Sequence, residues 1–148
     1  MSGTSEYPTF KSRMLTLIHD IPILKTKLYW EGLKEGKVYA TKCKKCGRVY
    51  YPPQVDCPSC LISEVEWIQL SNGTLETFAK VYLKPQGFTC YEQNYTLAIA
   101  KSIEGTKVMG WLEDADNGVI KIGTPVEITA KIMPDGFPVI IFKPKKFH

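Results

Sequence analysis

Four cysteines in two pairs place the tightest constraint on this chain. Cys43 and Cys46 form one Cys-x-x-Cys pair, Cys57 and Cys60 form the other, and ten residues separate the pairs. A two-residue spacer lets both sulfurs of a pair face inward from one tight turn, so two pairs can set four thiolates at the corners of a tetrahedron. The spacing therefore predicts a rubredoxin-like zinc ribbon over residues 43–66, with Zn²⁺ bound by these four cysteines.

Other uses of the cysteines fit less well. Two disulfides would need an oxidising compartment, of which the sequence shows no sign. A redox Cys-x-x-Cys motif usually occurs once, at the start of a helix. Iron in the same cage remains the competing metal. Because four thiolates leave no open coordination position, we expect the metal to stabilise the fold and not to catalyse.

Composition narrows the class of protein. The 148 residues are 44% hydrophobic and 23% charged, which is typical of a soluble globular chain. No apolar run approaches the ~20 residues that cross a bilayer, and the first residues lack the apolar core of a secretory signal. We therefore expect a cytoplasmic protein with no membrane partner. The formal net charge of +4 is too small to demand a nucleic acid as partner.

The chain before the ribbon, residues 1–42, is predicted to be an N-terminal helical segment. Tyr29, Trp30 and Leu33 form an apolar stripe in a helix expected over residues 25–35, and Gly36 suits its C-terminal cap. Trp30 either packs on the rest of the fold or borders a ligand groove. A strand over residues 38–41 then leads into the first cysteine pair.

Basic residues gather at the first cysteine pair. Lys44, Lys45 and Arg48 lie within or just after it. Cations beside a negatively charged thiolate cage are expected on electrostatic grounds alone. The same side chains could instead bind a phosphate, so both interpretations stay open.

The remainder, residues 67–148, is predicted to be a five-stranded OB-fold barrel with a basic tail. Residues 61–72 are expected to be a connection without a strand. Alternation and turn residues place strands at 74–84, 95–102, 107–112, 126–133 and 139–142. The fold class is thus mainly β. An SH3-like barrel is the rival, because strand counting alone does not separate the two.

Alternation also predicts which side chains face inward. The first strand is expected to turn Leu75, Thr77 and Ala79 inward, and the second strand Tyr95, Leu97 and Ile99. The opposite face of the first strand then carries Phe78, Lys80 and Tyr82. Such a basic and aromatic stripe is the kind of surface with which OB-folds bind nucleotides and single strands.

Nothing in the sequence assembles a catalytic centre. A nucleophilic cysteine needs a neighbouring base. Cys90 is the one cysteine outside the pairs, and the two histidines, His19 and His148, have no evident link to it. We therefore expect that the chain is not an enzyme.

Four stretches carry a resemblance: Tyr29 to Gly36, the segment CKKCGRVYYPPQVDCPSC from Cys43, Gly73 to Phe78, and Ile122 to Glu127. Their order resembles the zinc-ribbon/OB-fold acyl-CoA-associated proteins, a former domain of unknown function, over residues 20–142. The resemblance implies a non-catalytic scaffold that binds acyl-CoA, bridges thiolase-fold enzymes such as thiolase and hydroxymethylglutaryl-CoA synthase, and assists transfer of an intermediate. Two positions depart from the pattern, Gln54 where arginine is frequent and Leu61 where glycine is frequent.

Three hypotheses follow. The first is the acyl-CoA-binding scaffold, the second a single-stranded nucleic-acid module, and the third a structural subunit without a ligand. In the first, cations would meet the CoA phosphates and aromatic rings would stack on its adenine. The candidate ligand-binding residues are Trp30, Lys44, Lys45, Arg48, Phe78, Lys80 and Tyr82.

Overall fold

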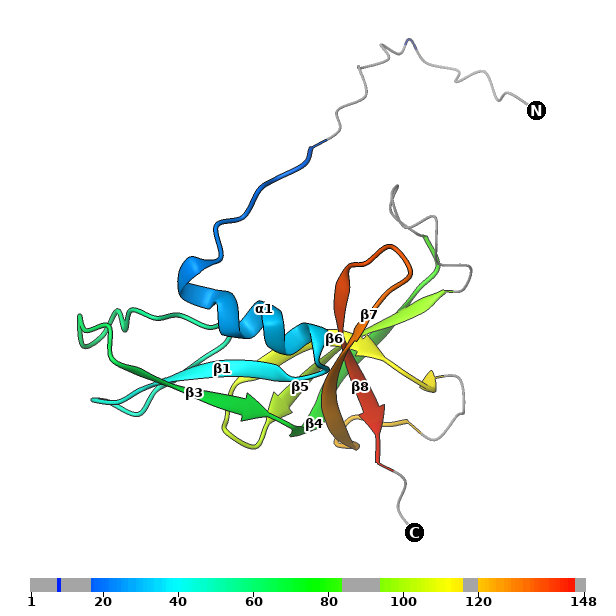
Figure 1. Ribbon diagram of the computed structural model, residues 1–148. Coiled ribbons are helices and arrows are strands. Elements are labelled where there is room, and N and C mark those ends of the chain that lie inside the picture. The colour runs from blue at the N-terminus through cyan, green and yellow to red at the C-terminus, as the bar shows by residue number, and fades with distance from the viewer. Residues whose placement is uncertain (1–7, 9–16, 84–93, 116–119, 146–148) are drawn as a thin grey trace.

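The computed structural model describes residue 8 and residues 17–83, 94–115 and 120–145 (Figure 1). Cys90 and the last three residues of the predicted basic tail lie outside these ranges. Within these ranges lie a 3-10 turn η1 (Leu24–Thr26), one helix α1 (Lys27–Lys34) and eight strands: β1 (Val38–Cys43), β2 (Val49–Tyr50), β3 (Val65–Leu70), β4 (Asn72–Val81), β5 (Tyr95–Ser102), β6 (Lys107–Leu112), β7 (Pro125–Ile132) and β8 (Pro138–Pro144). The mainly β fold class is confirmed.

Helix α1 confirms the expected helix, and two glycines let it pack. Gly36, with φ of 78°, ends it in the left-handed conformation. The amide of Lys37 donates to the Gly32 carbonyl at 2.8 Å, which closes the last turn. A Cβ on Gly32 would come within 2.6 Å of the Tyr39 ring, so glycine here allows the helix to lie close against β1.

The ribbon is a three-stranded antiparallel sheet in the order β2-β1-β3. Our prediction that residues 61–72 form a plain connection is wrong, because β3 lies within them. It pairs with β1 over the full length, from Val38 opposite Leu70 to Cys43 opposite Val65. Acidic residues at the start of this segment made its short strand pattern difficult to recognise in the sequence. Pairing on this side supplies hydrogen-bond partners to an edge of β1 that would otherwise stay open.

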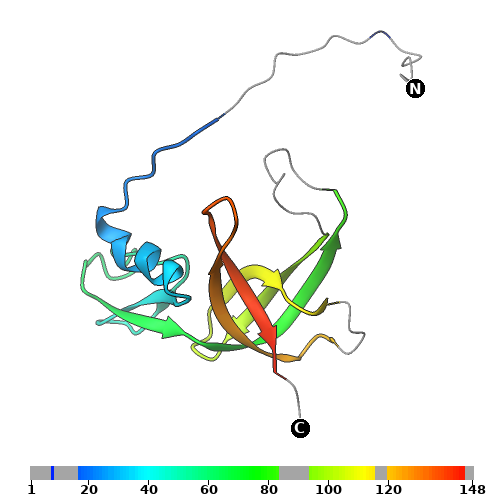
Figure 2. The same cartoon turned by 45° about the vertical axis from the view of Figure 1, so that its right-hand side comes forward.

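The second half closes into a five-stranded barrel in the order β4-β5-β6-β8-β7 (Figure 2). Strand β6 pairs in parallel with β8, and the other barrel pairings are antiparallel. The five predicted barrel strands are confirmed. Helix α1 lies against β1, β7 and β8, and Thr129 donates its hydroxyl to the Gly36 carbonyl at 2.9 Å. Helix, ribbon and barrel share one core, whose buried members are Leu33, Val38, Ala40, Leu70, Leu75, Ala98, Ala100, Val108, Leu112, Val126, Ile128 and Phe142.

The predicted inward face of β5 is wrong. Its buried residues are the small ones, Thr96, Ala98, Ala100 and Ser102, while Tyr95, Leu97 and Ile99 are half-buried on the other side. Closing only five strands leaves a narrow interior. On the neighbouring β6, a Cβ on Gly110 would come within 2.8 Å of the Ile140 carbonyl oxygen. Small side chains on β5 and β6 therefore leave room for the larger ones of β8.

The predicted faces of β4 hold only for its first part. The pairing with β5 shifts between Leu75 and Thr77, which marks a β-bulge. Leu75 is buried as expected, but Thr77 and Ala79 are exposed. After the bulge Phe78 stands opposite Ala98, so the inward and outward sets exchange. One extra residue is enough to turn every later side chain to the other face.

Candidate metal centre

Each cysteine pair lies on a tight turn with the same backbone plan. The amide of Gly47 donates to the Cys43 carbonyl at 2.9 Å, and the amide of Leu61 donates to the Cys57 carbonyl at 2.8 Å. Both residues have a positive φ, 73° at Gly47 and 55° at Leu61. Strand β1 delivers Cys43 to the first turn, and a bridge between Cys57 and Ile62 fixes the second. The two turns therefore face one another as a matched pair of knuckles.

The four thiols meet at one point. Their Sγ atoms all lie within 4.8 Å of one another, and those of Cys46 and Cys57 are 3.8 Å apart. A tetrahedral site with Zn–S bonds of about 2.3 Å has sulfur–sulfur edges of roughly 3.8 Å. All four cysteines are free thiols, which removes the two-disulfide alternative. The thiol positions thus fit a tetrahedral metal ion.

Neighbouring groups shift the pKa values of two of the thiols in opposite directions. The Tyr50 hydroxyl lies 3.2 Å from the Cys57 sulfur, and this hydrogen bond lowers the pKa of Cys57 to about 6. The adjacent Cys46 sulfur raises the pKa of Cys60 to about 12. Four thiols this close cannot all ionise without a cation. A bound divalent metal would remove that conflict, which is how metal binding at such sites couples to proton release.

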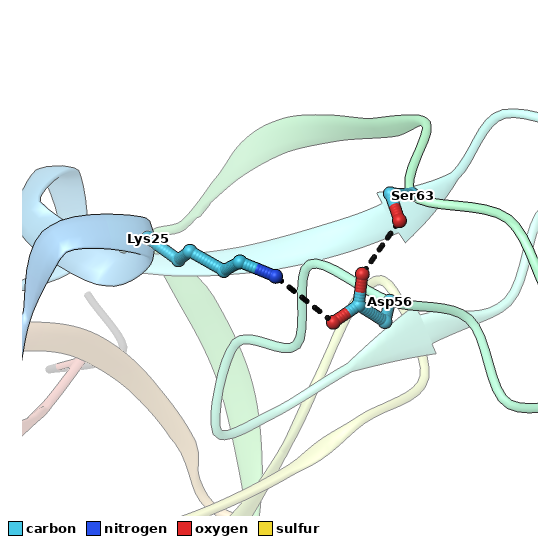
Figure 3. Close-up of polar contacts among 3 residues, drawn as sticks. All are labelled: Lys25, Asp56 and Ser63. Carbon is cyan, nitrogen blue, oxygen red and sulfur yellow. Dashed lines mark hydrogen bonds and ion pairs between the residues drawn. The ribbon is translucent and has the colours of Figure 1, made fainter.

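A polar contact ties the helical segment to the second knuckle (Figure 3). Lys25 Nζ lies 3.4 Å from Asp56 Oδ2, and Ser63 donates its hydroxyl to Asp56 Oδ1 at 2.6 Å. The Ser63 hydrogen bond, followed by the Lys25 charge, lowers the pKa of Asp56. Asp56 directly precedes Cys57. The sequence analysis did not predict this contact, although an aspartate next to a metal-ligand position could have indicated it.

The candidate ligand residues divide into separate groups. Arg48 donates to the Ser59 hydroxyl and so links the two knuckles, while Lys44 and Lys45 are exposed on the first knuckle. Trp30 is half-buried and packs edge-on against Tyr29, with ring centroids 5.4 Å apart.

The remaining three candidates lie on β4 after the bulge or just beyond its end. Phe78 is 38% exposed and Tyr82 is 67% exposed, and Lys80 Nζ lies 5.7 Å from the centroid of the Tyr82 ring. Figure 1 shows the knuckles at the tip of the ribbon and the end of β4 at the far side of the barrel. The structure therefore does not gather the seven candidates into one pocket.

Comparison with known families decides the relationship. Residues 30–66 match the model described as the ChsH2 rubredoxin-like zinc ribbon domain, and residues 67–131 match that of the ChsH2 C-terminal OB-fold domain. The chain belongs to this family. The resemblance inferred from the sequence is confirmed, and the second match decides for the OB-fold over the SH3-like barrel.

Individual relatives agree with this assignment. The chain is 33% identical to a DUF35 domain-containing scaffold protein of Methanocaldococcus jannaschii, over 80% of this chain and 86% of that protein. It is 30% identical to the benzoylsuccinyl-CoA thiolase subunit BbsA of Thauera aromatica, over 71% of this chain and 73% of BbsA. A solved structure titled Ltp2-ChsH2(DUF35) aldolase superposes with a TM-score of 0.67 at 21% identity, over 79% and 91% of the two chains. That likeness shows the shared fold.

Among the helices of the described ranges, none has the length and apolar character needed to span a bilayer.

Proposed function

We propose that this DUF35-family chain is a non-catalytic scaffold subunit that associates with a thiolase-fold enzyme in the cytoplasm. The single observation that carries the proposal is its similarity to BbsA, a protein named as a thiolase subunit, over 71% of the chain. Several further relatives are named as scaffold proteins. The partner enzyme would supply the catalytic groups, and this chain would hold it in an assembly.

The metal centre supports a structural role. Cys43, Cys46, Cys57 and Cys60 would hold one Zn²⁺, with iron as the competing metal. Bound zinc supplies a cross-link between the knuckles and stabilises the negative charge of four thiolates. Since four protein ligands complete a tetrahedron, the site offers no position at which a substrate could coordinate.

Acyl-CoA is the ligand that we propose for the assembled complex. Lys44 and Lys45 offer exposed cations beside the ribbon, and Lys80 with Tyr82 offers a cation and a ring close together. Either group could bind the phosphates and adenine of CoA, and Trp30 could border the acyl chain. Because the groups lie apart, we propose that the partner enzyme completes the CoA site and that the scaffold assists transfer of the intermediate.

Co-expression tests the proposal directly. The full chain is produced with a thiolase or a hydroxymethylglutaryl-CoA synthase from the same organism, and the complex is sought by size-exclusion chromatography with light scattering. We expect a stable complex of defined stoichiometry, with no turnover of acetoacetyl-CoA by the purified chain alone. Turnover by the pure chain, or failure of every thiolase-fold enzyme of that organism to bind it, would contradict the proposal.

A titration separates acyl-CoA from nucleic acid. A CoA site with an apolar channel should bind longer acyl chains more tightly, by up to ~0.8 kcal/mol per buried methylene, with a shallow salt dependence. Single strands bind through many phosphates and weaken steeply with salt. Tight oligonucleotide binding near physiological salt, with no response to acyl-CoA with or without the enzyme, would favour the nucleic-acid module instead.

A further inference from the structure

Apolar side chains from three barrel strands gather on the outer side of the sheet. The pairing register sets Val81 opposite Tyr95, Leu97 opposite Trp111, and Ile99 opposite Met109. Residues directly opposite each other in an antiparallel pair project from the same side of the sheet. Because Thr96, Ala98 and Ala100 fill the interior, these other side chains face outward. We call them the β4–β6 face: Val81, Tyr95, Leu97, Ile99, Met109 and Trp111.

The β4–β6 face is partly exposed to solvent, and its two aromatic side chains are packed against each other. Met109, on β6, is 58% exposed, and the other five side chains are half-buried. The rings of Tyr95 and Trp111 stack with centroids 4.5 Å apart and planes 21° from parallel. Stacked aromatic side chains offer a large contact area that loses little conformational entropy on binding. The face therefore has the composition of the centre of a protein interface.

The rest of the barrel supplies an internal comparison. On β7 and β8 the outward residues include Glu127 opposite Lys143, and Lys131. Helix α1 packs against the same two strands (Figure 2). One flank of the barrel is thus charged or covered by the helix, whereas the β4–β6 face is apolar. A contiguous apolar surface that is rimmed by polar residues marks an interaction site more often than a chance arrangement.

Charges at the rim indicate the chemistry of the partner. Lys101 stands opposite Lys107 in the next row of the sheet, beyond Ile99 and Met109. Glu76 forms an ion pair with Lys107 at 2.8 Å, so Lys107 is already neutralised within the chain. Lys101 is exposed at the same rim. A matching surface would be apolar at its centre and would place a carboxylate near Lys101. A nucleic acid fits poorly, since its phosphates would lie over six side chains without a positive charge.

The geometry of the barrel restricts how a partner can attach. The barrel is closed, and its strand β5 pairs with β4 over Tyr95–Ser102 and with β6 over Leu97–Lys101. Addition of a partner strand to an open sheet edge, a common mode of attachment, is therefore not available at β5. A partner that covers β5 must therefore contact its outward side chains.

Resting on the proposed function, we propose that the β4–β6 face is the surface through which this chain docks on its thiolase-fold enzyme. The partner surface is an apolar patch of that enzyme bordered by a carboxylate. A second copy of this chain is the competing occupant, and the experiment distinguishes it from the enzyme.

The test compares two variants that place a carboxylate at exposed aliphatic positions. Met109→Glu lies on the face, and Ile122→Glu is the matched control, since Ile122 is 72% exposed in the loop before β7. Each full-length zinc-loaded variant is titrated with the thiolase-fold enzyme that binds the wild-type chain. We expect Met109→Glu to weaken binding on the order of 30-fold, as at a central interface position, and Ile122→Glu to bind like wild type. Lys101→Glu should slow association and reduce its salt dependence.

The outcomes separate this inference from the proposed function. If the wild-type chain binds the enzyme and Met109→Glu binds equally well, the docking surface is wrong while the scaffold function stands. If no thiolase-fold enzyme binds the wild-type chain, both are overturned. Sedimentation of the chain alone covers the remaining case, because a dimer that Met109→Glu disperses would assign the face to a second copy. Unchanged zinc content and circular dichroism establish that each variant is folded.

Discussion

Replacing Leu61 by glycine should stabilise the protein, although it deletes a large apolar side chain. Leu61 has φ of 55°, in the left-handed region that costs a residue with a Cβ roughly 1–2 kcal/mol. Its side chain is 88% exposed, so its removal forfeits little burial. The first knuckle already has Gly47 at the equivalent position, with φ of 73° and the same backbone hydrogen bond to the first cysteine of its pair. Leu61 is thus the strained member of a matched pair.

The net gain is smaller than the strain. Glycine also widens the unfolded ensemble, which costs about 0.5–1 kcal/mol relative to alanine. The difference predicts that Leu61→Gly raises the free energy of unfolding by about 0.5–1 kcal/mol. For a chain of this size that corresponds to a rise in Tm of roughly 1–4 °C.

Equilibrium urea unfolding of the zinc-loaded protein measures the effect, with metal content determined on the same samples. Leu61→Ala is the matched control, because it removes the side chain but keeps a Cβ in the left-handed conformation. We expect Leu61→Ala to stay near wild type and Leu61→Gly to exceed it. A glycine variant no more stable than the alanine variant would refute the assignment of strain to this position.

Three further predictions concern the site and the barrel. Cys57→Ser should lose the metal and destabilise the ribbon, whereas Cys90→Ser should keep one ion per chain, as measured by metal analysis. Full metal content in Cys57→Ser would refute the assignment of the metal site to the ribbon. In the reduced, metal-free protein the folded-state pKa of Cys57 is depressed to about 6, so its contribution to stability is present above the unfolded pKa and is lost as pH falls through about 6. Tyr50→Phe should move that thiolate titration, followed by ultraviolet absorbance, to higher pH, and an unmoved curve would exclude the hydrogen bond as its cause. Gly110→Ala should lower the free energy of unfolding by about 1–3 kcal/mol, because the new Cβ would lie 2.8 Å from backbone and side-chain atoms of Ile140. An unchanged thermal unfolding curve would contradict this, since it would mean that β8 can shift to relieve the contact.

Features that depend on local spacing could be predicted from the sequence. Each Cys-x-x-Cys pair brings its two sulfurs together because its turn is closed by residues next to it in the chain. Gly36 ends the helix for the same reason. The barrel strands follow from alternation and turn residues within each segment. In all these cases, the atoms that decide the conformation lie within a few residues of each other.

Features that depend on contacts between distant segments needed the tertiary structure. Strand β3 forms because it pairs with β1, and the residues in and around β3 do not predict that pairing. The large apolar side chains of β5 lie on its outer face and small ones on its inner face, so the hydrophobic pattern indicated the wrong face. The narrow interior and the close approach of Ile140 to Gly110 admit only the small set. One bulge after Leu75 then exchanges the faces of β4 and separates Phe78 from its expected surface. Closure of the barrel decides these choices, because the space left inside depends on all five strands at once.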